Sequence, residues 1–310
     1  MKQEVNLNIG YFRFLLANLV LLSHTGVRIY GLNEGVFAVV IFYILAGHVV
    51  SKLFEEIFNK DYRQFYFDRF LRIYPLYWFF CFWVLVFLVI SNFGSPKIIV
   101  FKLFSNFAII PLNYYMYIPD WINVLKDSIG NWNLIPPAWS LGTEVQVYLL
   151  MPFLLVYRWF FAIGFLGSLF VYSLANLNII HSDYFGYRLV VGVLFMFLLG
   201  VLIQRVVSKR ASRLDKLLLI GCYLFVSFWF LVVVLYFGKY GAYTKETMLG
   251  ILLGVPVVYL ILKLWKKKSK VNYLFGDLSY GVFLSHFFGI WIWEYFTGCQ
   301  CGKFFVLFVF

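Results

Sequence analysis

The amino-acid sequence predicts an all-α, polytopic membrane protein, a bundle of about ten transmembrane helices. Of its 310 residues, 63% are hydrophobic and only 13% are charged, whereas soluble domains have about 45–50% and about 25%. The mean hydropathy is +0.85. Aromatic residues make up 23% of the chain, as expected of a protein whose helices cross the two membrane–water interfaces many times, because Trp and Tyr are enriched there. These values exclude soluble enzymes, secreted disulfide scaffolds and disordered tails.

The predicted spans are apolar stretches of about 20 residues, the length that crosses a bilayer as a helix. Nine stretches are strong candidates: 11–29, 35–53, 73–92, 140–157, 161–180, 187–205, 217–237, 246–264 and 277–297. Two stretches are weaker, because 98–112 is short and ends near Pro111, and 303–310 stops after eight residues. We expect 98–112 to be interfacial or re-entrant, 303–310 to begin a truncated last helix, and the whole of 1–310 to form a single domain.

The orientation follows from the distribution of lysine and arginine. Segments 52–72, 205–216 and 263–270 hold fifteen of the 26 basic residues, so the positive-inside rule places all three in the cytoplasm. Two cytoplasmic segments are joined by an even number of crossings, which is why 98–112 is not counted as a span. The N-terminus is then cytoplasmic. The net charge of +12 reflects this bias, and we expect no nucleic-acid partner.

Two ionisable residues lie within the first predicted span, Arg13 and His24. Such residues are costly in a membrane and usually face the interior of the bundle. They are eleven residues apart, so they share one helix face about 16 Å apart along the axis. Arg13 is expected near the cytoplasmic end and His24 toward the outer end. The alternatives are a snorkelling anchor for Arg13 and a helix-packing hydrogen bond for His24.

A second pair, Arg69 and Arg72, stands just before a predicted span. Their spacing puts them on one helical face, where two planar guanidinium groups can bind phosphate oxygens. The alternative is ordinary positive-inside charge beside an aromatic belt.

Two further predicted spans contain ionisable residues. Glu144 lies near the start of span 140–157, and His286 lies within span 277–297. We expect Glu144 at about the depth of His24, where a carboxylate would fix the imidazole tautomer and raise its basicity. The alternative for Glu144 is simple capping of its helix. The alternative for His286 is a hydrogen bond to a neighbouring helix. No metal-binding motif is present, and we expect no metal.

Taken together, these segments resemble the acyltransferase 3 family, polytopic membrane acyltransferases of the O-antigen and exopolysaccharide O-acetylase type. The resemblance runs in family order over nearly the whole chain. The matching segments are Arg13-x10-His24, Phe42-Tyr43-Ile44-Leu45-Ala46-Gly47, Arg69-x-x-Arg72-Ile73-x-Pro75, Trp139-Ser140-Leu141-x-x-Glu144 and Ser279-Tyr280-x-x-x-Leu284-x-His286. Two positions depart from the family pattern, since Ala46 stands where the family usually has Ser and His48 where an aromatic residue is usual.

The resemblance implies an enzyme of the bacterial cytoplasmic membrane that transfers an acyl group, most often acetyl, from acyl-CoA to a carbohydrate hydroxyl. We predict that His24 is the general base and that Glu144 orients its imidazole. Arg13, Arg69 and Arg72 are expected to bind the phosphates of acetyl-CoA, the co-substrate. Three residues are unranked candidates for supporting the oxyanion: Ser140, Tyr280 and His286. Direct transfer and a covalent acyl-histidine relay both remain open.

Two other functions fit part of the pattern. A transporter or flippase for a lipid-linked or anionic solute would also need intramembrane His and Arg residues. It would not explain why Arg69-x-x-Arg72-Ile73-x-Pro75 and Trp139-Ser140-Leu141-x-x-Glu144 occur together. An inactive, truncated family member is the other alternative.

Overall fold

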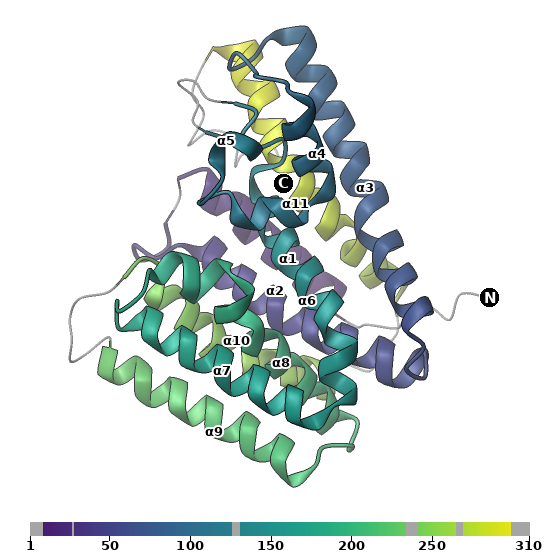
Figure 1. The fold of residues 1–310 in the computed structure, drawn as a ribbon, viewed down its shortest axis with the longest axis vertical. Helices are drawn as coiled ribbons and strands as arrows, with labels where there is room; N and C mark the ends of the chain where they lie inside the picture. The colour runs from purple at the N-terminus through teal and green to yellow at the C-terminus, as the bar shows by residue number, and fades with distance from the viewer. Residues whose placement is uncertain (1–8, 27, 126–130, 234–240, 265–268, 299–310) are drawn as a thin grey trace.

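The computed structural model describes residues 9–26, 28–125, 131–233, 241–264 and 269–298, and helices make up most of this part of the chain (Figure 1). The α-helices are α1 Gly10–His24, α2 Glu34–Ser51, α3 Tyr62–Ser91, α4 Val100–Ala108, α5 Pro119–Ile122, α6 Trp139–Val156, α7 Arg158–Asn176, α8 Val190–Val207, α9 Arg213–Phe230, α10 Thr244–Leu264 and α11 Lys270–Thr297. Two π-helical segments, Lys52–Ile57 and Tyr184–Arg188, adjoin α2 and α8. Apart from isolated bridges, the described residues contain no strand, so the all-α prediction is confirmed.

Seven helical segments of the described chain are long and apolar enough to cross a membrane. They are Glu34–Ile57, Tyr62–Ser91, Pro136–Val156, Arg158–Asn176, Tyr184–Val207, Arg213–Val233 and Thr244–Leu264. These segments match, in order, seven of the nine strong candidates, and the protein is a membrane protein. The total of about ten spans is not confirmed, because α1 has only 15 residues and α11 includes charged residues such as Asp277 and Glu294.

The two weaker stretches have different outcomes. Stretch 98–112 forms the nine-residue α4 and part of a 3-10 turn, Ile110–Tyr114. Nine residues extend about 14 Å as a helix, too short to cross the bilayer, so this segment is not a span. Stretch 303–310 lies outside the described residues.

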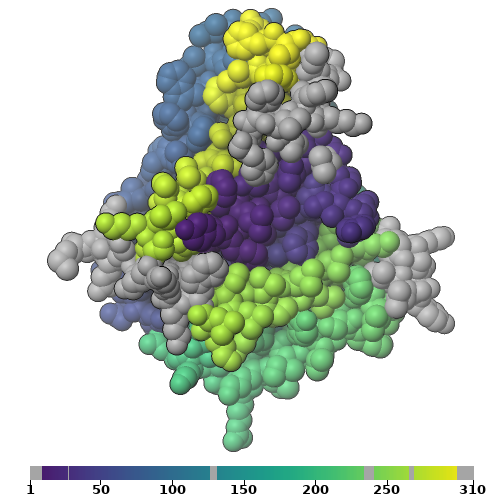
Figure 2. All heavy atoms as spheres, turned by 180° about the vertical axis from the view of Figure 1, so that it is seen from behind, coloured from purple at the N-terminus to yellow at the C-terminus, as the bar shows by residue number. Residues whose placement is uncertain are grey.

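The helices form two groups joined by α1. In Figure 1, α7, α8, α9 and α10 lie together with α2, whereas α3 and α11 extend toward the opposite end of the molecule. Helix α1 packs against both α2 and α11. The space-filling view from behind shows α1 in purple between the yellow end of α11 and the green helices (Figure 2).

Helices α1 and α11 run parallel and in close contact. A Cβ atom at Gly10 would collide with the backbone carbonyl oxygen of Asn272, so only glycine permits this approach. The Tyr11 backbone N–H donates a hydrogen bond to the Asn272 side-chain oxygen at 3.0 Å. At the other end of the pair, the ring of His24 meets that of His286. The first and last described helices therefore share one interface along their length.

A second close contact joins α2 to α8 in the other group. A Cβ atom at Gly47 would collide with the carbonyl oxygen of Phe197, and one at Gly200 with that of Ile44. The two backbones approach closely because both partners offer glycine at the crossing point. Small residues commonly allow membrane helices to pack in this way.

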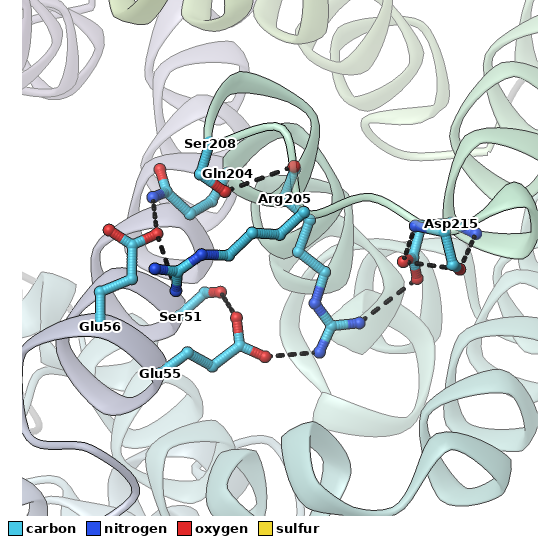
Figure 3. Close-up of polar contacts among 9 residues, drawn as sticks. Ser51, Glu55, Glu56, Gln204, Arg205, Ser208 and Asp215 are labelled. Carbon is cyan, nitrogen blue, oxygen red and sulfur yellow. Dashed lines mark hydrogen bonds and ion pairs between the residues drawn. The ribbon is translucent and has the colours of Figure 1, made fainter.

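Ion pairs join helix ends near two of the predicted cytoplasmic segments, 52–72 and 205–216. Arg205, at the end of α8, pairs with Glu55 at 2.6 Å and with Asp215 at 3.3 Å, which joins the segment after α2 to the start of α9 (Figure 3). Arg72 pairs with Asp277 at 2.7 Å, which joins the first half of α3 to that of α11. Each set of ion pairs ties helix ends to one another, and the orientation of the chain in the membrane stays a prediction.

Candidate functional site

A cavity of about 740 Å³ lies beside the ion pair of Arg72 and Asp277, which both line it. Its walls come from the starts of α1, α3 and α11, the end of α2 and the middle of α6. Five of the predicted site residues line it: Arg13, Arg69, Arg72, Glu144 and Tyr280. These residues are up to 267 positions apart (280 minus 13) in the sequence, and the fold brings them to one chamber.

The two arginines of α3 line the cavity, and the side chain of Arg69, 12% exposed, is more enclosed than that of Arg72. Arg69 forms an ion pair with Asp68, and its guanidinium lies 5.6 Å from the centroid of the Tyr148 ring. The side chains of Arg72 and its partner Asp277 are 38% and 70% exposed, so water screens this pair and it contributes little stability. Both arginines line one cavity, and their role in binding phosphate stays a prediction.

Arg13 and Glu144 line this cavity and also a smaller pocket beside it. Glu144 accepts a hydrogen bond from the hydroxyl of Tyr148, one turn later on α6. Glu144 is also close enough to Arg13 to act on it electrostatically. The buried Nε of Arg13 has no hydrogen-bond partner. The carboxylate thus serves as a counter-charge between a tyrosine and an arginine, and no hydrogen bond of the described residues makes it a helix cap.

A smaller pocket of about 60 Å³ adjoins the cavity. It shares five lining residues with the cavity, Glu144 among them, so the two spaces are neighbours across a common wall. Its other lining includes Tyr43, Ser140, Ser279 and Phe283. We call this space the inner pocket. It has room for only a few water-sized groups.

Two of the predicted oxyanion candidates line the inner pocket, but their protons are already engaged. The Ser140 hydroxyl donates to the carbonyl oxygen of Pro137 at 2.9 Å. The Tyr280 hydroxyl donates to the carbonyl oxygen of Ile73 on α3 at 3.0 Å. Both side chains therefore serve local backbone contacts in this structure.

The two predicted histidines lie together, away from the cavity. The ring of His24 stacks on that of His286, with centroids 5.3 Å apart, and also contacts Phe287. His286 Nδ1 is 3.1 Å from the carbonyl oxygen of Val282, one turn earlier in its own helix. His286 is buried, while His24 is exposed. The hydrogen bond of His286 is therefore within α11 and not to a neighbouring helix.

The predicted contact between His24 and Glu144 is absent from the described residues. No hydrogen bond or ion pair joins them, and Glu144 binds Tyr148 instead. The reason is depth, because Glu144 lies beside Arg13, and His24 is about 16 Å farther along α1. The structure thus groups Glu144 with the arginines, and the orientation of the His24 ring depends on its aromatic neighbours.

One charged residue near the site was not singled out from the sequence, Arg188. Its Nε pairs with Asp183 at 2.7 Å, and its guanidinium lies 4.4 Å from the centroid of the Trp139 ring. It is close enough to act electrostatically on both His24 and Tyr43. A signal was present, because an arginine at the predicted outer end of a span runs against the positive-inside rule.

Comparison with known proteins identifies one family. The model of the acyltransferase 3 family, described as an acyltransferase domain, matches residues 6–309. An uncharacterized protein of Aquifex aeolicus (strain VF5) is 53% identical over 180 residues, which are 58% of this chain and 81% of that protein. No solved structure matches the chain.

Proposed function

The chain belongs to the acyltransferase 3 family of membrane acyltransferases, and on that premise we propose that it transfers an acetyl group from acetyl-CoA to a hydroxyl of a cell-surface or secreted carbohydrate. The observation that carries the proposal is the shape and charge of the cavity. Three arginines line it, and it adjoins a pocket of acetyl size. A thioester on a phosphorylated carrier would place its phosphates beside the arginines and its acyl group in the inner pocket.

The basic end of the cavity suits the phosphates of coenzyme A. Arg69 and Arg72 present two planar groups from one face of α3, and guanidinium binds phosphate through paired, charge-assisted hydrogen bonds. Arg13 lies deeper and would meet the polar part of the pantetheine arm. Acetyl-CoA is made in the cytoplasm, so we propose that this end faces the cytoplasm of a bacterial cell, with the N-terminus on that side.

The inner pocket favours a short acyl group. Its volume of about 60 Å³ holds a few atoms, and the ring of Phe283 forms part of its lining. A longer acyl chain would have to displace packed side chains, which is costly in a dense interior. This supports acetyl over longer groups.

We assign His24 as the general base for the acceptor. Its exposed ring lies toward the predicted outer end of α1, the side from which a surface carbohydrate would arrive. His24 lines neither space, but Phe283 at the end of the inner pocket lies 6.3 Å, between ring centroids, from His286, which stacks on His24. A thioester that extends past Phe283 would bring its carbonyl to His24, which would take the proton of the attacking acceptor hydroxyl, a role typically worth about 10²–10⁴-fold in rate. Glu144 keeps a place in the site as the carboxylate that balances Arg13.

The test is the acetyl content of the host's surface glycan, measured by proton NMR. A gene deletion is complemented with wild type, His24→Ala or the control His181→Ala, whose exposed ring stacks on Tyr184 away from both cavities. We expect wild type and His181→Ala to restore the acetyl signal and His24→Ala to fail at equal membrane expression. Equal rescue by all three would refute His24 as the base. No loss of acetyl on deletion would refute this acceptor and favour transport.

A further inference from the structure

Helix α11 shows how far the cavity and the inner pocket reach into the bundle. Asn272, Gly276 and Tyr280, each one turn after the last, line the cavity. Tyr280 also lines the inner pocket, whose last lining residue along α11 is Phe283. His286 follows three residues later, about 4.5 Å along the axis, and lines neither space. Along α11, both spaces therefore end about one turn before His286.

Helix α2 shows the same order from the other side. Its start lies beside the end of α1, because a Cβ atom at Gly35 would collide with the Ser23 hydroxyl oxygen. Val39 is the first residue of α2 that lines the inner pocket, Ala46 lines both spaces, and Leu53, just after the helix, lines only the cavity. The inner pocket therefore lies between the cavity and the end of α1 that carries the histidine.

Phe283 stands between the inner pocket and the two stacked histidines. It lines the pocket, and its ring centroid is 6.3 Å from that of His286, whose ring in turn stacks on His24. The residue is only 9% exposed, so closely packed neighbours hold the ring in place. An acyl thioester that moves from the pocket toward His24 must therefore pass this ring.

We propose that Phe283 selects the length of the acyl group. Its ring narrows the passage from the inner pocket to His24, so an acetyl thioester passes and a longer acyl thioester is excluded. This inference rests on the proposed function, because it concerns the acyl group that the enzyme transfers. It assigns to one side chain the preference for short groups that the pocket volume of about 60 Å³ favours.

Packing arguments give the expected size of the effect. Butyryl has two methylene groups more than acetyl, and a protein interior as dense as an organic crystal has little spare room for them. Added methylenes in a packed site force neighbouring side chains and backbone to shift. One methylene changes the discrimination between substrates of a hydrophobic pocket by about 10–200-fold. Removal of the Phe283 ring should therefore relieve most of the discrimination against butyryl.

Two substitutions of Phe283 and one control separate selection from packing. Phe283→Ala removes the ring, and Phe283→Leu replaces it with a smaller side chain at less cost in packing. Phe288→Ala is the control, because Phe288 lies on the same helix, lines neither space and packs against Phe87 of α3 with centroids 5.8 Å apart. A loss of folded protein lowers the activity with every acyl-CoA alike, whereas a wider passage changes the preference between them.

The experiment compares acetyl-CoA with butyryl-CoA as substrates of the purified full chain in lipid nanodiscs. Membranes of the deletion strain supply the unacetylated glycan, and the release of coenzyme A thiol gives kcat/KM for each substrate. We expect wild type to prefer acetyl-CoA. Phe283→Ala should raise the butyryl-to-acetyl ratio of kcat/KM about 10–200-fold, Phe283→Leu should raise it less, and Phe288→Ala should keep the wild-type ratio.

Three results would overturn the inference alone. They are a ratio within about threefold of wild type in both Phe283 variants, an equal rise in Phe288→Ala, and an active wild type that uses butyryl-CoA as well as acetyl-CoA. If Phe283→Ala does not fold, the ratio for Phe283→Leu decides. A wild type that releases no thiol from acetyl-CoA above the rate without membranes would overturn the proposed function, and the role of Phe283 with it.

Discussion

The imidazole rings of His24 and His286 stack with centroids 5.3 Å apart and join α1 to α11. His286 Nδ1 bonds a backbone carbonyl oxygen, so this nitrogen carries the proton and the buried, unpartnered Nε2 presents a lone pair. A neutral His286 in this state cannot donate to an oxyanion. Its contribution is the ring that holds His24 in place.

We therefore expect His286→Phe to keep most of the activity. The phenyl ring preserves the stack, so acetyl transfer should fall less than about tenfold, against about 10²–10⁴-fold for removal of a general base in His24→Ala. The measurement is the rate of glycan acetylation at equal membrane expression. If His286→Phe were as inactive as His24→Ala, His286 would have a direct chemical role.

The substitution Arg72→Ala should weaken the binding of acetyl-CoA. A hydrogen bond to a charged group contributes about 1.5–3 kcal/mol, so the KM for acetyl-CoA should rise about 10–100-fold while kcat changes little. Arg63→Ala is the control, since Arg63 is an exposed residue of the same helix that does not line the cavity. Initial rates measured across acetyl-CoA concentrations give kcat and KM for both variants. An equal rise in KM for Arg72→Ala and Arg63→Ala would mean that only the general positive charge of this helix matters.

The substitution Tyr148→Phe should destabilise the protein through Glu144. It removes a buried hydrogen bond to a carboxylate, so the free energy of unfolding should fall by about 1.5–3 kcal/mol. Tyr66→Phe removes an exposed hydrogen bond to the neutral carbonyl of Leu149 and should cost about 1 kcal/mol or less. Unfolding followed by tryptophan fluorescence measures both. Equal losses would show that the carboxylate contact has no special strength.

The substitution Gly200→Ala should disrupt the crossing of α2 and α8. The added Cβ would collide with the carbonyl oxygen of Ile44, and overpacking of this kind costs about 1–3 kcal/mol or more. Gly221→Ala on α9 meets no atom within 4 Å and should be neutral or stabilising by up to about 1 kcal/mol. Thermal midpoints and the yield of monodisperse protein in detergent report the difference. A Gly200→Ala protein as stable as wild type would mean that the helices separate at no cost.

The sequence was sufficient to predict the long apolar helices, because about 20 apolar residues in a row have few other places to go. It located their ends less well. Helix α3 begins at Tyr62 and not near 73, since Asp61 caps it by accepting hydrogen bonds from Arg63 and Gln64. The polar first turns of α3 belong to the cavity wall, and hydropathy alone assigns such turns to a loop.

The candidate site was predictable where the argument stayed within one helix, as for Arg69 and Arg72. It was not predictable where the register between helices decides the contact. Glu144 bonds Tyr148 one turn later in α6, a contact that the spacing within the helix allows. Its place beside Arg13 depends on how α1 and α6 are arranged, and no spacing within one helix carries that information.

The pairing of α1 with α11 also bears on how the protein is made. Tyr11 and Asn272, 261 residues apart, are hydrogen-bonded, so a ribosome releases the second partner long after the first has entered the bilayer. Contacts between such distant parts of a chain form late in folding. Until α11 is inserted, the Gly10 face of α1 lacks its partner and the cavity lacks one wall. The cavity of a newly made chain is therefore complete only when the last described helix has joined the bundle.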